Sequence, residues 1–406
     1  MTKQEIIEAA FKVWGRDFYR KTSLSQLARE LGVSKPALYR HFENKQALTA
    51  AMSEHFFDGF AVSVRADFEK ALQTGDTDEG IFTIIQSISS YFARNVYNLI
   101  FFLVNINDRN IDSRTIPEQF KNRGTDIGII RLVIQKKYDT APATLQLIFA
   151  SIVFYVTHFH ETNKSFEKSP SDKDISDITR KIFTVIKNGL GFPAEQTGSL
   201  DLQKLEVMVD GTLRSEEPEP LFKAVAEAVA EAGPWDTSMD MVAKRMGLSK
   251  SSLYGHFKNR KDMLRRLFLN EFKRIIEFAR QGISLSTVPA QQLYLGIYSI
   301  AFYLRSRHEV LEALNWIRTR KLDLGKPEKK MEIFFRLFED VEIDPFKNSR
   351  EEEKRKISHL ILFLLINILM RPYMSGNKNL SVKDVRNDDI RLLYKFITLG
   401  LGGFIR

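Results

Sequence analysis

Residues 22–48 read TSLSQLARELGVSKPALYRHFENKQAL, and residues 237–263 read TSMDMVAKRMGLSKSSLYGHFKNRKDM. The two stretches align without a gap at a constant offset of 215, and eleven of their 27 positions are identical. A shared pattern at one fixed offset indicates an internal repeat, in which one supersecondary unit occurs twice. The chain of 406 residues is therefore expected to contain two related halves.

Each stretch has the pattern of two short helices joined by a tight turn. In the first stretch a helical pattern covers 24–31, and Gly32 supplies a permissive backbone for the turn. Ser34 can cap a second helix over 35–42, with Pro36 in its first turn, where proline is tolerated. This arrangement predicts a helix-turn-helix, a motif whose second helix enters the major groove of DNA.

The candidate DNA-contacting residues are the exposed positions of the second helix, the capping hydroxyls and the first basic residue of the next helix. Leu38 and Phe42 lie four residues apart and are expected to face inward. Basic side chains can reach phosphates or guanine edges, and a tyrosine hydroxyl can reach a phosphate. The candidates in the first head are Thr22, Ser34, Lys35, Pro36, Ala37, Tyr39, Arg40, His41 and Lys45. Those in the second head are Thr237, Ser249, Lys250, Ser251, Ser252, Tyr254, His256 and Arg260.

Both stretches resemble the TetR family of transcriptional regulators, whose signature ends in L-Y-x-H-F-x-x-K-x-x-L. Residues 38–48 match every fixed position, and residues 253–263 match with Arg for Lys and Met for Leu. The resemblance covers the two heads, a quarter of the chain. It implies a dimer whose two heads bind adjacent major grooves, and a small molecule in the helical domain that releases the DNA. It also implies phosphate contacts by Tyr39, His41 and Lys45, with Lys35, Pro36 and Ala37 near base edges.

Three features depart from that pattern. Phe18 stands where the family usually has glycine, whereas the second head keeps Gly233 there. Gly255 replaces Arg40 in the second recognition helix, and a glycine inside a helix costs about 1 kcal/mol relative to alanine. The second head is also acidic outside its recognition face. It is therefore expected to bind DNA more weakly or to read a different sequence.

The composition permits nucleic-acid binding without establishing it. Lys and Arg total 60 against 51 Asp and Glu, a net charge of +9, which favours binding to polyanions. The absence of Cys excludes disulfides, thiolate nucleophiles and cysteine zinc sites. The charged N-terminal residues favour an amphipathic helix rather than a signal peptide, and the most apolar stretch, 357–370, is shorter than the roughly 18–20 residues that span a bilayer. We expect a cytoplasmic protein with no membrane segment.

The hydrophobic spacing outside the repeat is helical, which predicts an all-α fold with two three-helix heads, each followed by a helical-bundle regulatory domain. The expected domains are head 1 (1–48), regulatory domain 1 (49–192), a linker (193–219) whose patch at 205–209 can dock locally, head 2 (220–263) and regulatory domain 2 (264–406). The last helices of each unit are apolar, so the central hypothesis is a pseudo-two-fold single-chain dimer. Further homodimerisation, with four heads, is the rival assembly.

The predicted function is a sequence-specific regulator of double-stranded DNA, a repressor released by a small apolar ligand. The alternative is an interaction protein or antirepressor that has lost DNA binding. The histidines lack metal-ligand spacing and no catalytic motif is present, so neither a cofactor nor enzymatic activity is expected. Aromatic residues can line a ligand cavity or simply form core; the candidates are Phe92, Phe101, Phe102, Phe149, Tyr155, Tyr298, Phe302 and Trp316.

Overall fold

The computed structural model describes residues 2–17, 23–107, 111–163, 169–214, 219–319, 337–338, 340–374 and 384–406. The first unit contains α1 (Lys3–Asp17), α2 (Leu24–Glu30), α3 (Lys35–Tyr39), α4 (Lys45–Gln73), α5 (Thr77–Arg94), α6 (Val96–Asn107), α7 (Ile116–Lys121), α8 (Gly128–Gln135), α9 (Pro142–Thr162) and α10 (Asp172–Asn188). Between the units lie α11 (Ala194–Thr197) and α12 (Leu202–Thr212). The second unit contains α13 (Pro220–Asp236), α14 (Met239–Met246), α15 (Lys250–His256), α16 (Arg260–Ile283), α17 (Pro289–Ser306), α18 (His308–Thr319), α20 (Glu351–Leu369), α21 (Arg371–Met374), α22 (Asn387–Leu399) and the 3-10 helix η2 (Gly400–Phe404).

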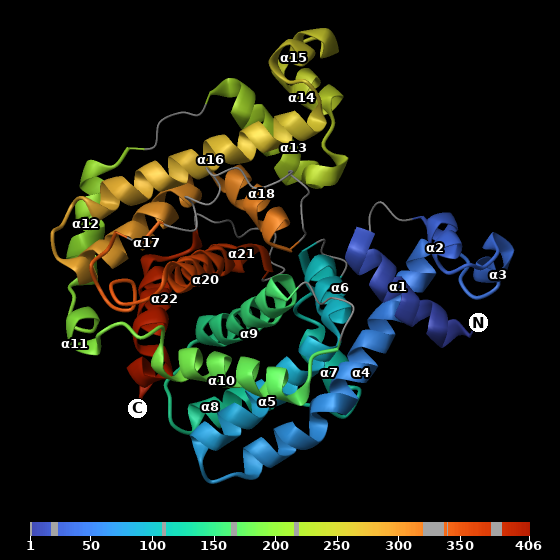
Figure 1. The fold of residues 1–406 in the computed structure, drawn as a ribbon, viewed down its shortest axis with the longest axis horizontal. Coiled ribbons are helices and arrows are strands. Elements are labelled where there is room, and N and C mark those ends of the chain that lie inside the picture. The colour runs from blue at the N-terminus through green and yellow to red at the C-terminus, as the bar shows by residue number, and fades with distance from the viewer. Residues whose placement is uncertain are drawn as a thin grey trace.

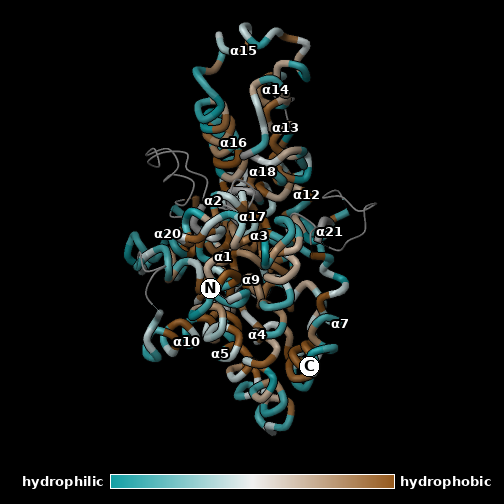
Figure 2. The backbone as a smooth tube through the Cα atoms, turned by 90° about the vertical axis from the view of Figure 1, so that its right-hand side faces the viewer, coloured by the Kyte–Doolittle hydropathy of each residue, from teal (hydrophilic) through white to brown (hydrophobic). Residues whose placement is uncertain are grey.

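The prediction of an all-α protein is confirmed. Within the described ranges, the only β-type pairing is an isolated bridge between Tyr138 and Ile405. The helices of the second unit follow the order of those in the first, from the helix-turn-helix to a terminal amphipathic helix (Figure 1). Hydrophobic segments lie toward the centre of the molecule in Figure 2, and hydrophilic ones toward its periphery.

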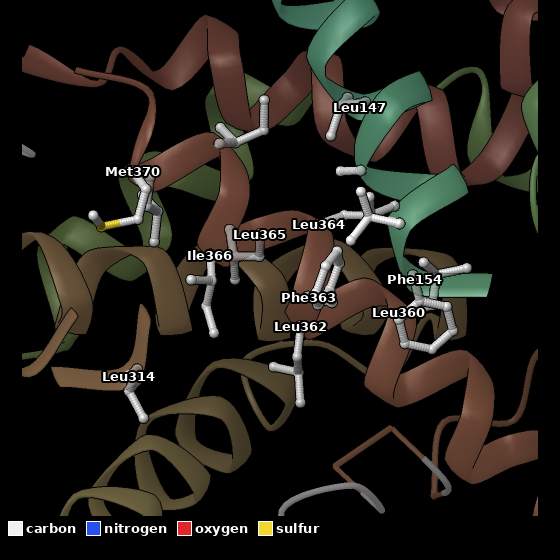
Figure 3. Packing of buried hydrophobic residues seen from close by; sticks show 14 of the residues in the cluster. Leu147, Phe154, Leu314, Leu360, Leu362, Phe363, Leu364, Leu365, Ile366 and Met370 are labelled. Atoms are coloured by element: carbon white, nitrogen blue, oxygen red, sulfur yellow. The ribbon is translucent and has the colours of Figure 1, made fainter. Parts of the chain in front are cut away.

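The two units meet through the helices that end each repeat. α9 and α10 of the first unit pack against α20 and α22 of the second (Figure 1). Figure 3 shows Phe154 of α9 facing the buried leucines and Phe363 of α20, and the Phe154 and Phe363 ring centroids lie 5.5 Å apart. The side-chain amide of Gln146 donates to the carbonyl oxygen of Asn367 at 2.8 Å. A mixed apolar and hydrogen-bonded face therefore joins the units.

Two equivalent glycines bring the backbones of the two units close together. Gly189 and Gly400 each follow the last helix of their repeat, with φ of 74° and 57°. A Cβ on Gly189 would lie 2.7 Å from the carbonyl oxygen of Ile397, and one on Gly400 would lie 2.5 Å from the backbone nitrogen of Gly189. Contact between equivalent positions is the arrangement that a two-fold axis produces in a symmetric dimer.

The segment predicted to be a linker is not an extended tether. Its helix α12 packs against α17, with Leu205 and Val209 buried. Glu206 of α12 is also buried and accepts hydrogen bonds from Arg391 (2.6 and 2.7 Å) and from Tyr294 (2.5 Å). Burial raises the pKa of Glu206, but the hydrogen bonds from Arg391 and Tyr294 outweigh it, so its pKa is lowered. The linker helix is therefore part of the second unit's core.

Helix α9 has the length and apolar composition of a membrane span. More than half of its apolar window, 56%, is buried inside the protein, and it packs against α5, α10, α20 and α22. These contacts make α9 a core helix that joins the two units.

Candidate nucleic-acid interface

The first head is a compact helix-turn-helix whose turn is set by Gly32. This glycine has φ of 64°, a left-handed conformation that favours glycine, and the chain reverses so that Val33 donates to the carbonyl oxygen of Ala28 at 3.0 Å. Ala28 and Leu38 are buried where α2 and α3 cross. The Ser34 hydroxyl accepts from the backbone N–H of Ala37 at 3.3 Å, which confirms the predicted helix cap.

The second head repeats this geometry. Gly247 has φ of 66°, and Leu248 donates to the carbonyl oxygen of Ala243 at 2.9 Å. The Ser249 hydroxyl accepts from the backbone N–H of Ser252 at 3.1 Å, and Leu253 is buried at the position of Leu38 in the first head. The same residue types at the same spacing therefore build the same turn twice.

Most of the predicted contact residues are exposed on the two heads. The two equivalent tyrosines, Tyr39 and Tyr254, are 43% and 48% exposed, which is high for a large aromatic side chain. Ala37, Lys45 and Arg260 are half-buried. The other exposed candidates are Ser34, Lys35, Pro36, Arg40 and His41 in the first head and Ser249, Lys250, Ser251, Ser252 and His256 in the second.

One of the two threonines among the predicted contact residues, Thr237, is buried. Thr237 is only 1% exposed, and its hydroxyl donates to the carbonyl oxygens of Gly233 (2.7 Å) and Ala228 (3.1 Å). Its prediction as a DNA contact is therefore wrong, because the hydroxyl is used inside the head, and Ser238 caps α14 instead. Thr22 lies outside the described residues, and Ser23 is the cap of α2.

The equivalent lysines of the two recognition helices have different surroundings. Lys250 forms an ion pair with Asp240 at 2.9 Å, and the first head has Ser25 at the position of Asp240. Lys35 lies 5.7 Å from the ring centroid of Tyr39, where its ammonium stays at the exposed face. The ion pair of Lys250 was not predicted, because it joins two helices.

The other two basic positions of the first head are also changed in the second. Arg40 is exposed on the first head, whereas Gly255 offers no side chain. Arg260 replaces Lys45, but its Nε donates to the carbonyl oxygen of Thr237 at 2.7 Å, and burial lowers its pKa. The Arg260 guanidinium is therefore turned partly into the head.

Two further exposed lysines of the second head lie near the start of α16. Lys258 and Lys261 are exposed there, and Lys258 occupies the position of Glu43 in the first head. Residues beside a recognition helix commonly contact phosphates, which position the protein without reading sequence. The second head therefore has two exposed lysines close to a recognition helix whose own lysine, Lys250, is ion-paired.

In Figure 1, head 2 with α14 and α15 lies at the top of the molecule, where α16 begins, and head 1 with α2 and α3 lies at the right, where α4 begins. Each head is packed onto its own regulatory domain, since α1 contacts α6 and α13 contacts α18. The rings of Phe11 and Phe101 meet edge-on at 5.1 Å in the first of these junctions. Phe101 was predicted to line a ligand cavity, but it joins the head to the regulatory domain.

The remaining residues predicted to line a ligand cavity do not lie together in the structure. Phe92, Phe102 and Phe149 lie together, with ring centroids of Phe92 and Phe102 at 6.2 and 6.4 Å from that of Phe149. Tyr155 instead lies at the face between the units, with the Lys356 ammonium 4.5 Å from its ring centroid. In the second unit, Phe302 stacks on Phe278, Tyr298 bonds to polar groups, and the Trp316 side chain is outside the described residues.

A buried charged cluster in the second unit was missed by the sequence analysis. Glu271, Arg307 and Glu309 are 1%, 3% and 4% exposed, and Arg307 pairs with both carboxylates. The Tyr303 hydroxyl donates to Glu271. The cluster ties α16, the helix that follows head 2, to α17 and α18. In the parts of the chain that the structure describes, no three acidic or histidine side chains gather as a metal site.

Comparison with known proteins identifies the heads. The model of the family described as bacterial regulatory proteins, tetR family, matches residues 6–52 and 221–267. The uncharacterized HTH-type transcriptional regulator YuxN of Bacillus subtilis (strain 168) is 38% identical over 53 residues, 13% of this chain and 18% of that protein. The fatty acid metabolism regulator protein of the same organism is 26% identical over 113 residues, 28% of this chain and 58% of that protein. The chain thus covers less than two thirds of the length of these relatives.

Among solved structures, the TetR family transcriptional regulator PfmR from Thermus thermophilus aligns with 44% of this chain and 95% of that chain, at 18% identity and a TM-score of 0.35. The two ranges matched by the family model contain the two helix-turn-helix heads, at the start of each repeat. The chain therefore carries the helix-turn-helix domain of the TetR family of bacterial regulatory proteins twice, once at the start of each repeat.

Proposed function

We propose that a single chain binds one DNA duplex as a pseudo-dimer, with one head in each half of a non-palindromic operator. The observation that carries this proposal is the contact between the equivalent glycines Gly189 and Gly400, in a face built from the last helices of both units. Such a face fixes the two heads relative to each other, as the subunit interface does in a two-fold dimer. In dimeric helix-turn-helix proteins, the heads bind half-sites about one helical turn apart.

The two heads differ at positions that are expected to lie near the bases. Pro36, Ala37 and Arg40 of the first head correspond to Ser251, Ser252 and Gly255 of the second. Arginine forms bidentate hydrogen bonds with guanine, and small apolar side chains contact the thymine methyl group, whereas serine hydroxyls accept or donate to several bases. Different side chains at equivalent positions support two different half-sites rather than a palindrome.

Selection of bound fragments from genomic DNA, followed by mobility-shift titration, tests this function. We expect one composite site to bind more tightly than a palindrome of either half-site, and sedimentation to give one chain per duplex. Equal preference for either palindrome, or two chains on one site, would contradict the single-chain arrangement.

The alternative, an interaction protein without DNA binding, gives a different outcome in the same assay. The intact chain would then fail to bind any duplex even at low salt, where phosphate contacts are strongest. A regulator instead loses its binding in a Lys35→Ala, Tyr39→Ala variant. The variant Val62→Ala, which changes an exposed side chain of α4 away from the heads, is the control for folding.

We also propose that the protein is a repressor and that an apolar ligand releases it from DNA. Phe92 and Phe102 lie beside Phe56, with ring centroids 6.4 and 4.7 Å from its own, and both also contact Phe149. Phe56 belongs to α4, the helix that begins at head 1, so a ligand inserted among these rings would displace α4 and the head. One relative is named a fatty acid metabolism regulator, and a long-chain fatty acid is therefore the first probe. Unchanged DNA binding and thermal stability with the fatty acid would contradict this part of the proposal.

A further inference from the structure

A hydrogen-bonded network in the second unit joins α12, α17 and α22. Asn387 is at its centre, because its amide nitrogen donates to Glu206 at 2.8 Å and to the Tyr298 hydroxyl at 3.1 Å. With both amide protons used in this way, the amide oxygen of Asn387 must face the remaining neighbour. That neighbour is Arg305, whose Nη1 donates to the Asn387 oxygen at 2.7 Å.

The orientation of Arg305 is fixed by two elements of this network. Its guanidinium carbon lies 5.9 Å from the ring centroid of Tyr298. The Tyr298 hydroxyl in turn donates to Asp210 of α12 at 3.1 Å. Burial and the Asp210 carboxylate raise the pKa of Tyr298 to about 12, so this hydroxyl keeps its proton. The arginine side chain is therefore held in place before anything binds to it.

The donors on the other edge of the Arg305 guanidinium make no hydrogen bond. Nε and Nη2 of Arg305 are both buried, and neither has a hydrogen-bond partner in the structure as described. Buried polar groups almost always have partners, and a charged donor without one is especially unfavourable. Nε and Nη2 point the same way and form the two-pronged edge that binds two oxygens of one carboxylate or phosphate.

The neighbouring acidic side chains have partners of their own. Glu206 pairs with Arg391 at 2.6 Å, Asp389 pairs with Arg371 at 2.6 Å, and Asp210 accepts from Tyr298. Two of the three nearby carboxylates are thus matched by their own arginines. Asp210 bonds to the Tyr298 hydroxyl, and none of the three carboxylates bonds to Nε or Nη2 of Arg305.

We propose that the Nε and Nη2 edge of Arg305 is a binding site for a compact oxyanion, a carboxylate or phosphate group of a small molecule. The site lies beside the linker helix α12 and is separate from the ring cluster of the first unit. Arg305 lies in the last turn of α17, so an anion held there bonds to the helix that α12 covers. The inference does not depend on DNA binding, since the site can be tested in the free chain.

Thermal denaturation and titration calorimetry of the full chain test the site. Inorganic phosphate and acetate are the two probes, each compared with chloride at the same ionic strength. We expect a saturable rise in melting temperature with at least one probe and none with chloride. A stronger effect of phosphate identifies a phosphate ligand, and a stronger effect of acetate identifies a carboxylate. The proposal is overturned if neither probe stabilises the chain beyond chloride.

Variants then assign the effect to Arg305. Arg305→Lys keeps the positive charge but lacks the two-pronged edge, and we expect it to weaken anion affinity about tenfold or more. The matched control is Arg94→Lys, in the last turn of the equivalent helix α5, where Arg94 already pairs with Asp172 at 2.6 Å. Equal affinity in Arg305→Lys and the wild type would refute the assignment. If Arg305→Lys does not fold, the arginine Nε–H resonances of the wild-type chain serve instead, and the absence of a shift on phosphate addition would refute it.

Discussion

Lys35 and Lys250 occupy the same place in the two recognition helices, yet only Lys250 has a carboxylate beside it, that of Asp240 at 2.9 Å. A lysine that contacts a phosphate releases bound counterions, whereas one already paired with an acid releases fewer. A single residue of α14 thus changes what the equivalent lysine contributes. At the level of residues, the two heads are alike in shape and different in charge.

This difference predicts unequal salt dependence. Lys35→Ala is expected to lower the slope of log affinity against log salt by about 0.9, the contribution of one phosphate contact. Lys250→Ala is expected to change the slope less, and Asp240→Asn to increase it by freeing Lys250. Fluorescence anisotropy of a labelled operator over a salt series measures all three. Equal losses of slope for Lys35→Ala and Lys250→Ala would show that the ion pair does not persist on DNA.

At the scale of the helices, the packing between the units depends on glycines where the two backbones come close. Gly189 and Gly191 both have positive φ, of 74° and 86°. They differ in surroundings, because a Cβ on Gly189 would lie 2.7 Å from the backbone of Ile397, whereas one on Gly191 would meet nothing within 4 Å. Alanine substitutions at these two positions therefore distinguish the cost of backbone strain from the cost of close packing.

We expect Gly191→Ala to lower the free energy of unfolding by about 1 kcal/mol, through the strain of a left-handed alanine. Gly189→Ala is expected to cost about 1–3 kcal/mol more, because the added methyl group overpacks the face between the units. Urea unfolding of both variants measures the difference. Equal destabilisation would mean that the units are not held together at Gly189.

For the whole molecule, one chain combines two heads that a symmetric dimer would make identical. The buried positions of the two recognition helices hold the same residue types: Leu38 matches Leu253, and Phe42 matches Phe257. Some of the exposed positions hold different residue types. The core of each head can therefore accept the recognition helix of the other without loss of packing.

Exchange of the two helices gives a prediction about the operator. Replacement of residues 250–257 by the sequence KPALYRHF of residues 35–42 is expected to shift the preference of the chain from the composite operator to a palindrome of the first half-site. Competition mobility-shift assays with the two duplexes measure this preference. The reciprocal exchange is the control and should select the other palindrome; an unchanged preference in both chimaeras would place sequence reading outside these helices.

A histidine in the face between the units also predicts that stability depends on pH. Burial, followed by the nearby His158, lowers the pKa of His359 to about 4, and Lys356, Lys181 and Glu352 lie close to this histidine pair. Between pH 6.5 and about 4 the unfolded chain binds a proton at His359 that the folded chain does not. Stability is therefore expected to fall as the pH drops through this window, by about 1.4 kcal/mol per pH unit at most.

The variant His359→Gln should lose this part of the pH dependence, because glutamine does not titrate. Thermal unfolding of the wild type and the variant between pH 4 and pH 7 provides the comparison. His308, whose side chain is 58% exposed, gives the control variant His308→Gln, which should keep the wild-type slope. Parallel curves for the wild type and His359→Gln would contradict the prediction.

The sequence by itself determined the elements and the repeat, because these depend on neighbours in the chain. Ser34 and Ser249 cap helices a few residues away, Gly32 permits a turn at its own φ, and apolar spacing defines each helix face. The exposed faces of both heads followed from the burial of Leu38 and its equivalent. The helix-turn-helix and the family were for this reason accessible from the sequence.

Only the tertiary structure decided which polar groups meet. Thr237 fits a surface cap by its sequence, but the backbone of α13 takes its hydroxyl. The docking of α12 through Glu206 and the pairing of Lys250 with Asp240 bring together separate helices. Local periodicity specifies which face of a helix is buried, but not which partner covers it. That partner is chosen by how the helices pack, and the chemistry of this protein depends on those choices.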